Sequence, residues 1–174
     1  MRARIHDRTP MTDRKTKSEL SHVDPEGRVR MVDVGGKAVT EREAVARGTI
    51  RVSGEALELV RTGAVSKGDP LQTARIAGIM AAKRTADLIP LCHPLALTHV
   101  EVDLRPRDDG YEIEARVKTT GQTGVEMEAL TAVAVAALTV YDMLKAIDRT
   151  MVIGEVRLVK KSGGRSDTFT LTDL

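Results

Sequence analysis

The sequence predicts an α+β fold in which helices cover one face of a mainly antiparallel sheet. Two observations lead to this class. Segments with strand-like alternation and segments with helical periodicity follow one another in the order ββααββαβ, and one pair of strands is joined by the short turn 106–110 as a hairpin. At 174 residues the chain has about the length of one domain, large enough to bury a core.

The strands are predicted from β-branched runs and from strict alternation of apolar and polar residues. Val100, Val102 and Leu104 alternate with polar residues, and Ile113, Ala115 and Val117 do the same after the turn. Two earlier segments and one late segment carry weaker versions of the pattern. The predicted strands span residues 29–34, 45–52, 98–105, 111–119 and about 155–160.

The helices are predicted from their capping residues and apolar spacing. A short helix over 55–61 follows Ser53 as N-cap, and a second begins at Asp69-Pro70, an N-cap followed by a natural first helical residue. The apolar stripe of this second helix is expected to be Ile76, Ile79 and Met80. The longest helix is expected from Val125 to about Asp148, with Thr123 and Glu126 forming a capping box at its start.

Charge and composition limit the classes of function. The chain has 27 Lys and Arg against 25 Asp and Glu, and residues 1–18 carry a local charge of +4 with almost no apolar content, so they are expected to form a disordered basic tail ahead of a single domain over 19–174. No Trp, one Phe and two Tyr leave few platforms for stacking bases, so nucleic acid is not the expected partner.

The cellular setting follows from the cysteine count and the apolar runs. A single cysteine, Cys92, suits a reducing compartment, and the cytoplasm is expected. The longest relevant uncharged run, Ala129 to Tyr141, has 13 residues, fewer than the roughly 20 that a spanning helix needs. No signal peptide core is present at the start. No membrane association is expected.

Several polar groups are candidates for a site, and each also has a purely structural interpretation. Lys67 precedes a helix N-terminus and would suit an anion, or is a surface lysine. Leu91, Cys92 and His93 stand between two prolines in an extended segment, which could be a site or a packing corner. Their spacing with His99 matches no standard zinc pattern, so no metal is expected. Lys160 to Ser166 places cations before glycines that could bind an oxyanion.

The long helix carries the strongest candidates. Asp142 and Lys145 are three residues apart and could share acid and base roles, or form a solvent-facing ion pair. Glu128 heads a helical row that leads to this pair, 14 residues away from Asp142 and so roughly 21 Å along a continuous helix. If the helix is continuous, its two ends are too far apart to contact the same small ligand. If both ends are functional, a second subunit must complete the site.

Seven blocks in one order closely resemble the cyclic pyranopterin monophosphate synthase family, which makes the first pterin intermediate of molybdenum cofactor biosynthesis. The resemblance covers about Leu20 to Phe169. The blocks are Met31-Val-Asp-Val-Gly-Gly-Lys37, Lys67-Gly-Asp, Thr73-Ala-Arg-Ile-Ala-Gly-Ile with Ala82-Lys-Arg-Thr85, Leu88-Ile-Pro-Leu-Cys-His-Pro-Leu95, Thr123-Gly-Val-Glu-Met-Glu-Ala-Leu-Thr131, Tyr141-Asp-Met-Leu-Lys-Ala146 and Lys161-Ser-Gly-Gly164. One departure is Arg165, where relatives often carry lysine.

The resemblance implies a ferredoxin-like subunit in a hexamer of three dimers, with sites between subunits. It implies a lyase that converts 3′,8-cyclo-7,8-dihydroguanosine 5′-triphosphate to cyclic pyranopterin monophosphate and diphosphate. No cofactor is expected, and whether a magnesium ion accompanies the triphosphate stays open. By motif, Asp142 is the catalytic residue and Lys145 its partner. The residues implied to bind or surround the substrate are Leu91, Cys92, His93, Met127, Glu128, Lys67, Glu126, Lys161, Lys37 and Arg42.

The sequence is also compatible with two other functions. One is a nucleotide-sensing oligomer of the same shape, in which the cations bind a phosphate ligand without chemistry. The other is an RNA-binding module that uses the basic tail, for which the affinity would depend steeply on salt.

Overall fold

The computed structural model describes residues 26–164 and 168–171. The expected basic tail over 1–18 and Arg165 lie outside the described residues. The chain divides into two units, Met1–Val32 and Asp33–Leu174, and all of the described helices and extended strands belong to the second.

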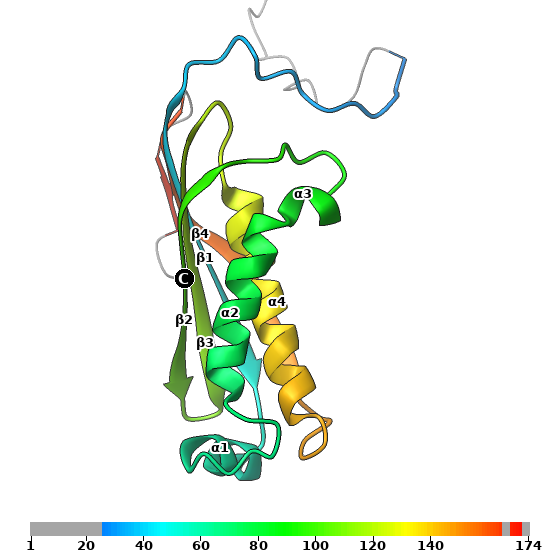
Figure 1. The fold of residues 1–174 in the computed structure, drawn as a ribbon, viewed down its shortest axis with the longest axis vertical. Coiled ribbons are helices and arrows are strands. Elements are labelled where there is room, and N and C mark those ends of the chain that lie inside the picture. The colour runs from blue at the N-terminus through cyan, green and yellow to red at the C-terminus, as the bar shows by residue number, and fades with distance from the viewer. Residues whose placement is uncertain (1–25, 165–167, 172–174) are drawn as a thin grey trace, which may run out of the picture. The chain divides into compact units, whose positions relative to one another are not determined.

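The second unit is an antiparallel sheet with helices on one face, as the sequence predicts (Figure 1). The strand order is β2-β3-β1-β4-β5, and each neighbouring pair is antiparallel. The strands are β1 (Thr40–Arg51), β2 (Leu97–Arg107), β3 (Gly110–Gly121), β4 (Val152–Ser162) and β5 (Phe169–Thr170). The helices are α1 (Gly54–Arg61), α2 (Pro70–Lys83), α3 (Thr85–Leu88) and α4 (Glu126–Leu144).

The core lies between the sheet and α4. Alternate β1 residues Ala44, Ala46 and Ile50 are fully buried, and so are Ile113 and Val117 on β3. Opposite them, α4 contributes small residues that let the backbones approach, and α2 packs beside α4 and against β2. Hydrophobic burial of this kind is the main favourable term in folding. Because α4 contacts β1, β3 and β4, the core fixes its direction relative to the sheet.

Of the described helices, α4 has the length and apolar composition that would allow a membrane crossing, and 56% of that stretch is buried inside the fold. Its fully buried side includes Ala132, Val133, Ala136 and Val140. In this structure α4 is therefore the central helix of the folded unit.

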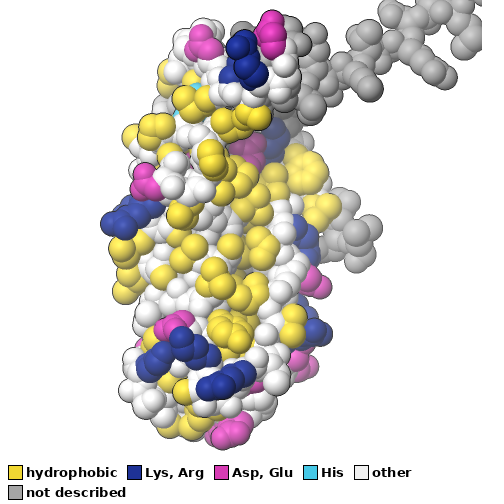
Figure 2. Space-filling view, turned by 90° about the vertical axis from the view of Figure 1, so that its right-hand side faces the viewer, with side chains coloured by type: hydrophobic (Ala, Val, Ile, Leu, Met, Phe, Trp, Pro, Cys, Tyr) yellow, Lys and Arg dark blue, Asp and Glu magenta, His cyan; other side chains and the backbone are white. Residues whose placement is uncertain are grey.

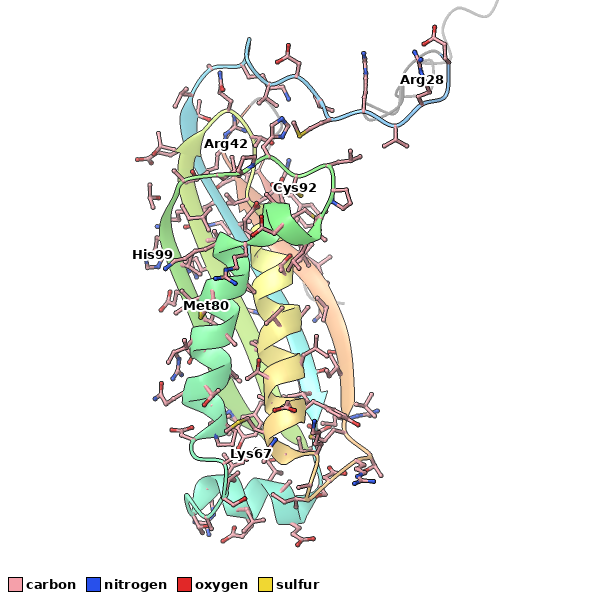
Figure 3. All side chains as sticks on the ribbon, turned by 45° about the vertical axis from the view of Figure 1, so that its right-hand side comes forward. Arg28, Arg42, Lys67, Met80, Cys92 and His99 are labelled. Atoms are coloured by element: carbon pink, nitrogen blue, oxygen red, sulfur yellow. The ribbon has the colours of Figure 1, made fainter. Side chains whose placement is uncertain are left out.

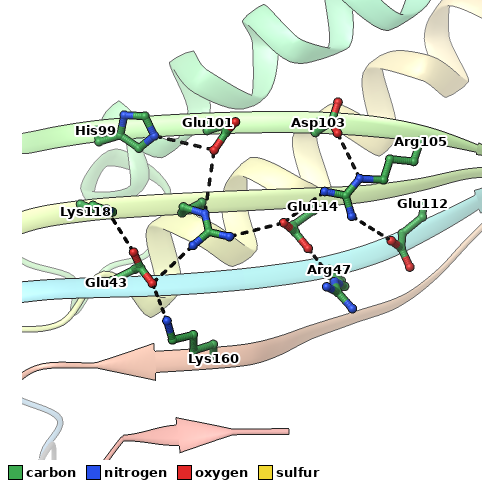
Figure 4. Close-up of polar contacts among 11 residues, drawn as sticks. Glu43, Arg47, His99, Glu101, Asp103, Arg105, Glu112, Glu114, Lys118 and Lys160 are labelled. Carbon is green, nitrogen blue, oxygen red and sulfur yellow. Dashed lines mark hydrogen bonds and ion pairs between the residues drawn. The ribbon is translucent and has the colours of Figure 1, made fainter. Parts of the chain in front are cut away.

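The other face of the sheet carries an ion-pair network (Figure 4). Glu43 lies 2.9 Å from Lys160 and 3.3 Å from Lys118, and Arg116 approaches it within 3.5 Å. The hydrogen bond from Lys160 is the largest cause that lowers the pKa of Glu43. Because charged side chains occupy alternate positions on this face, it remains exposed to solvent. The opposite, apolar face of the sheet packs against the helices.

Several boundaries and one burial pattern differ from the sequence prediction. Residues 29–34 do not form an extended strand, and only Val29 makes an isolated bridge. The helix predicted to reach Asp148 ends at Leu144, and the following turn is held by the Asp148 side chain. Strand β1 begins at Thr40, five residues before the predicted start.

The apolar stripe predicted for α2 is wrong at two of its three positions. Ile76 is 60% exposed and Met80 is 48% exposed, whereas Ala74, Gly78, Ala81 and Ala82 are buried. The physical reason is the close packing of α2 against α4. A Cβ on Gly78 would lie 2.9 Å from the backbone oxygen of Ala132, so the contact face must be made of the smallest residues.

Candidate functional site

The C-terminal end of α4 carries the Asp142 carboxylate between two ammonium groups. Lys145 Nζ lies 2.7 Å from Asp142 Oδ1, and Lys67 Nζ lies 3.3 Å from Oδ2. Lys67 also donates to the backbone oxygen of Asp142 at 2.8 Å. The hydrogen bond from Lys145, followed by that from Lys67, lowers the pKa of Asp142. The carboxylate is therefore ionised at neutral pH and the two lysines can act as proton donors beside it.

Local structure explains why Lys67 reaches this end of α4. It lies in the loop between α1 and α2, just before Asp69, whose carboxylate accepts from Leu71 N and Gln72 N. Because Asp69 occupies the N-terminus of α2, the anion site expected there next to Lys67 is not available. Lys67 instead contacts α4, and all three charged side chains of the cluster are about half exposed.

The N-terminal end of α4 borders a pocket of about 390 Å³. Lys37, Arg42 and Lys161 line it, together with Thr40, Glu126 and the Gly163–Gly164 turn. Arg42 donates to the backbone oxygens of Gly121 and Gln122, both at 3.3 Å. Three cations around one pocket make it suitable for an anion with several charges.

Glu126 does not form the capping box expected from its spacing to Thr123. The N-cap of α4 is Val125, without a side-chain capping bond. The Glu126 carboxylate lies 3.6 Å from Lys161 Nζ instead. An ion pair with β4 has replaced the local cap, so Glu126 belongs to the pocket.

Two glycines close the other side of this pocket. Gly163 and Gly164 have φ of +90° and +84°, in the left-handed region that favours glycine. A Cβ on Gly163 would collide with the backbone oxygen of Glu41, and one on Gly164 would collide with the Arg42 guanidinium. The glycines predicted as an oxyanion-binding turn are thus required where the chain bends around Arg42.

Glu128 and the segment Leu91–His93 meet at the same end of α4. Glu128 is 4% exposed, and its burial is the main cause that raises its pKa. Burial, followed by the charge of Glu128, raises the pKa of the Cys92 thiol. Leu91, Cys92 and His93 are partly exposed, and Met127 is 37% exposed. No group of three or more possible metal-ligating side chains occurs within residues 26–164 and 168–171.

Within one chain the candidate residues therefore form two separate groups (Figure 3). Arg42 and Cys92 lie toward the N-terminal end of α4, whereas Lys67 lies at its C-terminal end. The helix is continuous over 19 residues, or about 28 Å at 1.5 Å per residue. The predicted separation of the two ends is confirmed.

Four residues that line the pocket were missed by the sequence prediction: Ala38, Thr40, Glu43 and Gln122. Thr40 lines it, and Gln122 donates from Nε2 to the backbone oxygens of Gly35 and Lys37, which ties the loop carrying Lys37 to β3. The alternation Thr40, Arg42, Ala44, Ala46 could have extended the predicted strand to Thr40. No local signal marks Gln122, because its partners are distant in the sequence.

This chain is similar to known proteins over most of its length. Proteins named cyclic pyranopterin monophosphate synthase from Thermomicrobium roseum and from Roseiflexus sp. (strain RS-1) are similar to this chain. The first is 63% identical over 158 residues, covering 90% of this chain and 95% of the relative. The second is 65% identical over 154 residues, covering 87% and 98%. Residues 31–164, which include every candidate site residue, match the MoaC family. The chain therefore belongs to the MoaC family.

Proposed function

We propose that this chain is a cyclic pyranopterin monophosphate synthase, a lyase of molybdenum cofactor biosynthesis that converts 3′,8-cyclo-7,8-dihydroguanosine 5′-triphosphate to cyclic pyranopterin monophosphate and diphosphate. Relatives covering most of the chain at 57–65% identity carry this name. The observation that carries the residue assignment is the Asp142 carboxylate held between the Lys67 and Lys145 ammonium groups.

The cationic pocket at the N-terminal end of α4 binds the triphosphate in this proposal. The substrate carries three to four negative charges, and Lys37, Arg42 and Lys161 supply cations around a volume of about 390 Å³. Negative charge develops on the diphosphate as it leaves, and cations already in position stabilise it. Gly163 and Gly164 allow the chain to bend closely around Arg42 there.

The Asp142 cluster moves protons. Contact with the Asp142 carboxylate favours the protonated form of Lys145 and Lys67, so these two groups serve as acids. Asp142, whose pKa is lowered by both lysines, serves as the base or stabilises the protonated lysines. Opening of the five-membered ring and closure of the pterin ring both need such transfers.

Leu91, Cys92, His93, Met127 and Glu128 bind the base-derived part of the substrate. The segment 91–93 and the start of α4 lie next to each other, and Glu128 is a nearly buried carboxyl group beside Cys92. Burial raises the pKa of Glu128, which favours the protonated, hydrogen-bond-donating form more than in an exposed carboxyl group.

A second copy of the chain must supply one of the two groups to each site. A two-fold arrangement with α4 antiparallel to its counterpart brings the Asp142 end of one copy to the pocket end of the other. The exposed side of α4 carries Leu138, 58% exposed, in helical spacing with Asp142. Figure 2 shows hydrophobic side chains gathered over the middle of this face. Three such dimers would form the hexamer expected from the resemblance.

The remaining parts of the proposal concern the setting. The enzyme acts in the cytoplasm, needs no cofactor, and has neither nucleic acid nor a membrane as its partner. The nearly neutral net charge of +2 is consistent with a small-molecule substrate.

The direct test is to incubate the protein with the cyclised guanosine triphosphate and to measure diphosphate and the pterin product. Stoichiometric release of diphosphate with formation of the pterin is expected. Tight binding with an unchanged ligand would instead identify a nucleotide sensor and would contradict the proposal.

A further inference from the structure

The hydroxyl group of Thr40 lacks a partner although it is buried. Among the side chains that the structure describes, Thr40 Oγ1 is the only oxygen or nitrogen that is shielded from solvent and makes no hydrogen bond. A buried polar group without a partner destabilises the folded state, so an isolated case in a folded protein calls for an explanation.

Thr40 also lines the cationic pocket. It is the first residue of β1, and Arg42 stands two residues later on the same side of the strand. This side continues through Ala44 and Ala46 to Gly48, where a Cβ would contact Val133 of α4. Thr40 therefore lies on the side of β1 that faces the N-terminal end of α4.

The other groups that line the pocket indicate which kind of ligand could form a hydrogen bond with the Thr40 hydroxyl. Lys37, Arg42 and Lys161 can only donate hydrogen bonds. Two carboxylates also line the pocket, and both are already paired: Glu126 with Lys161 at 3.6 Å and Glu43 with Lys160 at 2.9 Å. A ligand that satisfies these groups together must present several acceptor oxygens and negative charge. Phosphate oxygens have this character.

We propose that the Thr40 hydroxyl donates a hydrogen bond to a phosphate oxygen of the substrate, and to the diphosphate product before it leaves. This inference rests on the proposed function and deepens it. Thr40 thereby becomes a binding residue of the phosphate subsite, and its unsatisfied hydroxyl is completed when the pocket is filled.

The test compares Thr40→Val with Thr40→Ser, using inorganic diphosphate as the probe in titration calorimetry. Thr40→Val keeps the shape of the side chain and removes the hydroxyl. Its dissociation constant for diphosphate is expected to rise about tenfold or more, because a hydrogen bond to a charged group is lost. Thr40→Ser is expected to restore the affinity. The KM for the cyclised triphosphate should rise in parallel, with a smaller change in kcat.

Stability without ligand provides a second measurement. Since the hydroxyl has no partner in the empty protein, Thr40→Val should melt at the same temperature as the wild type or slightly higher. The matched control is Thr49→Val on the same strand, where Oγ1 donates to the backbone oxygen of Gly154 at 3.4 Å. This control should leave the affinity for diphosphate unchanged.

Two results would overturn the proposal. One is an unchanged diphosphate affinity in Thr40→Val, and the other is a clear loss of thermal stability in that variant without ligand, which would reveal a partner within the protein. Both measurements are independent of turnover. A wild type that binds diphosphate through Thr40 but releases none from the cyclised triphosphate would refute the proposed function and the substrate named here, while Thr40 would remain a phosphate-binding residue.

Discussion

Glu128 is a buried carboxyl group near the N-terminal end of α4. It is 4% exposed, and its burial raises the pKa, with a smaller effect in the same direction from Glu126. A carboxyl group kept in the interior costs stability when it ionises. Retaining it at the N-terminal end of α4 is consistent with a role in binding and not in folding.

Replacing Glu128 by Gln should therefore stabilise the protein as the pH rises. The folded-state pKa of Glu128 lies above the ordinary value of 4.5, so the folded state binds more protons and loses stability as the pH increases through this range. In Glu128→Gln this loss is absent. Thermal melts at pH 4 and pH 7.5 should show a variant that gains relative to the wild type only at the higher pH. An equal difference at both values would contradict the burial argument.

Replacing Asp142 by Asn tests the proton-transfer role of the cluster that it forms with Lys67 and Lys145. Asp142→Asn keeps the shape but removes the charge that Lys67 and Lys145 contact. We expect kcat to fall by about 10²–10⁴-fold, the usual contribution of an acid–base group, with a small change in KM. Asp108→Asn, in the exposed turn between β2 and β3, is the matched control. A near-normal kcat in Asp142→Asn would contradict the proposed role of Asp142 in proton transfer.

At the scale of elements, the contact between α2 and α4 depends on one glycine. A Cβ at Gly78 would lie 2.9 Å from the backbone oxygen of Ala132 and 3.2 Å from Val102. Neither the helix backbone nor the buried valine can move without opening the core. The position that helix propensity alone would assign to alanine is thus held by glycine.

Gly78→Ala should lower the free energy of unfolding. Alanine favours a helix by about 1 kcal/mol, but overpacking a core typically costs about 1–3 kcal/mol, so a net loss of about 1 kcal/mol is expected. Urea denaturation measures the difference. Gly54→Ala, at the start of α1 with nothing within 4 Å of the new Cβ, should not lose stability. A stabilised Gly78→Ala protein would show that α2 and α4 can separate freely.

The turn after α4 is held by the Asp148 side chain. Asp148 accepts from Ser53 N at 2.7 Å, from Thr150 N at 2.8 Å and from Thr150 Oγ1 at 2.7 Å. It thereby joins the N-cap of α1 to the turn that follows Lys145. The hydrogen bonds from Thr150 are the largest causes that lower the pKa of Asp148.

Asp148→Asn should destabilise the protein at neutral pH by about 1–3 kcal/mol, as expected for loss of hydrogen bonds to a buried charged group. A lowered pKa means that the stabilisation is present above the ordinary value of 3.8 and is lost as the pH falls through the folded-state value. Wild type and variant should therefore converge in strong acid. Melting curves that remain separate by the same amount at every pH would contradict this account.

At the scale of the whole molecule, the distance along α4 decides how a site can be assembled. Asp142 and Glu126 are 16 residues apart on a continuous helix, or roughly 24 Å. The charged outer face of the sheet is satisfied by its own ion pairs, whereas α4 presents apolar residues on its exposed side. The helix side is therefore the surface suited to a second copy.

Coexpressing Asp142→Asn with Lys161→Ala tests the shared site. In a two-fold dimer with random pairing, half of the molecules are mixed and each has one intact site, so about a quarter of wild-type activity should return. Asp142→Asn coexpressed with Lys145→Ala is the control, because both changes affect the same end of α4 and no intact site can form. Recovery in neither mixture would show that the site is not shared across this dimer.

The amino-acid sequence alone predicts the class of the fold, the hairpin, the caps of α1 and α2, and the pairing of Asp142 with Lys145. These features depend on neighbours within a few residues, and local periodicity and capping express them directly. The seven blocks also identified the family, which the comparisons confirm.

The folded structure was needed to show which face of α2 is buried, where α4 ends, that Glu126 pairs with Lys161, and that Thr40 lies unpartnered in the pocket. Each of these depends on groups that are distant in the sequence. Packing of α2 against α4 overrides apolar periodicity, and an ion pair to β4 displaces a local cap. In both cases a tertiary contact outweighs a local sequence preference. A short stretch of sequence does not show which distant residues will make such contacts.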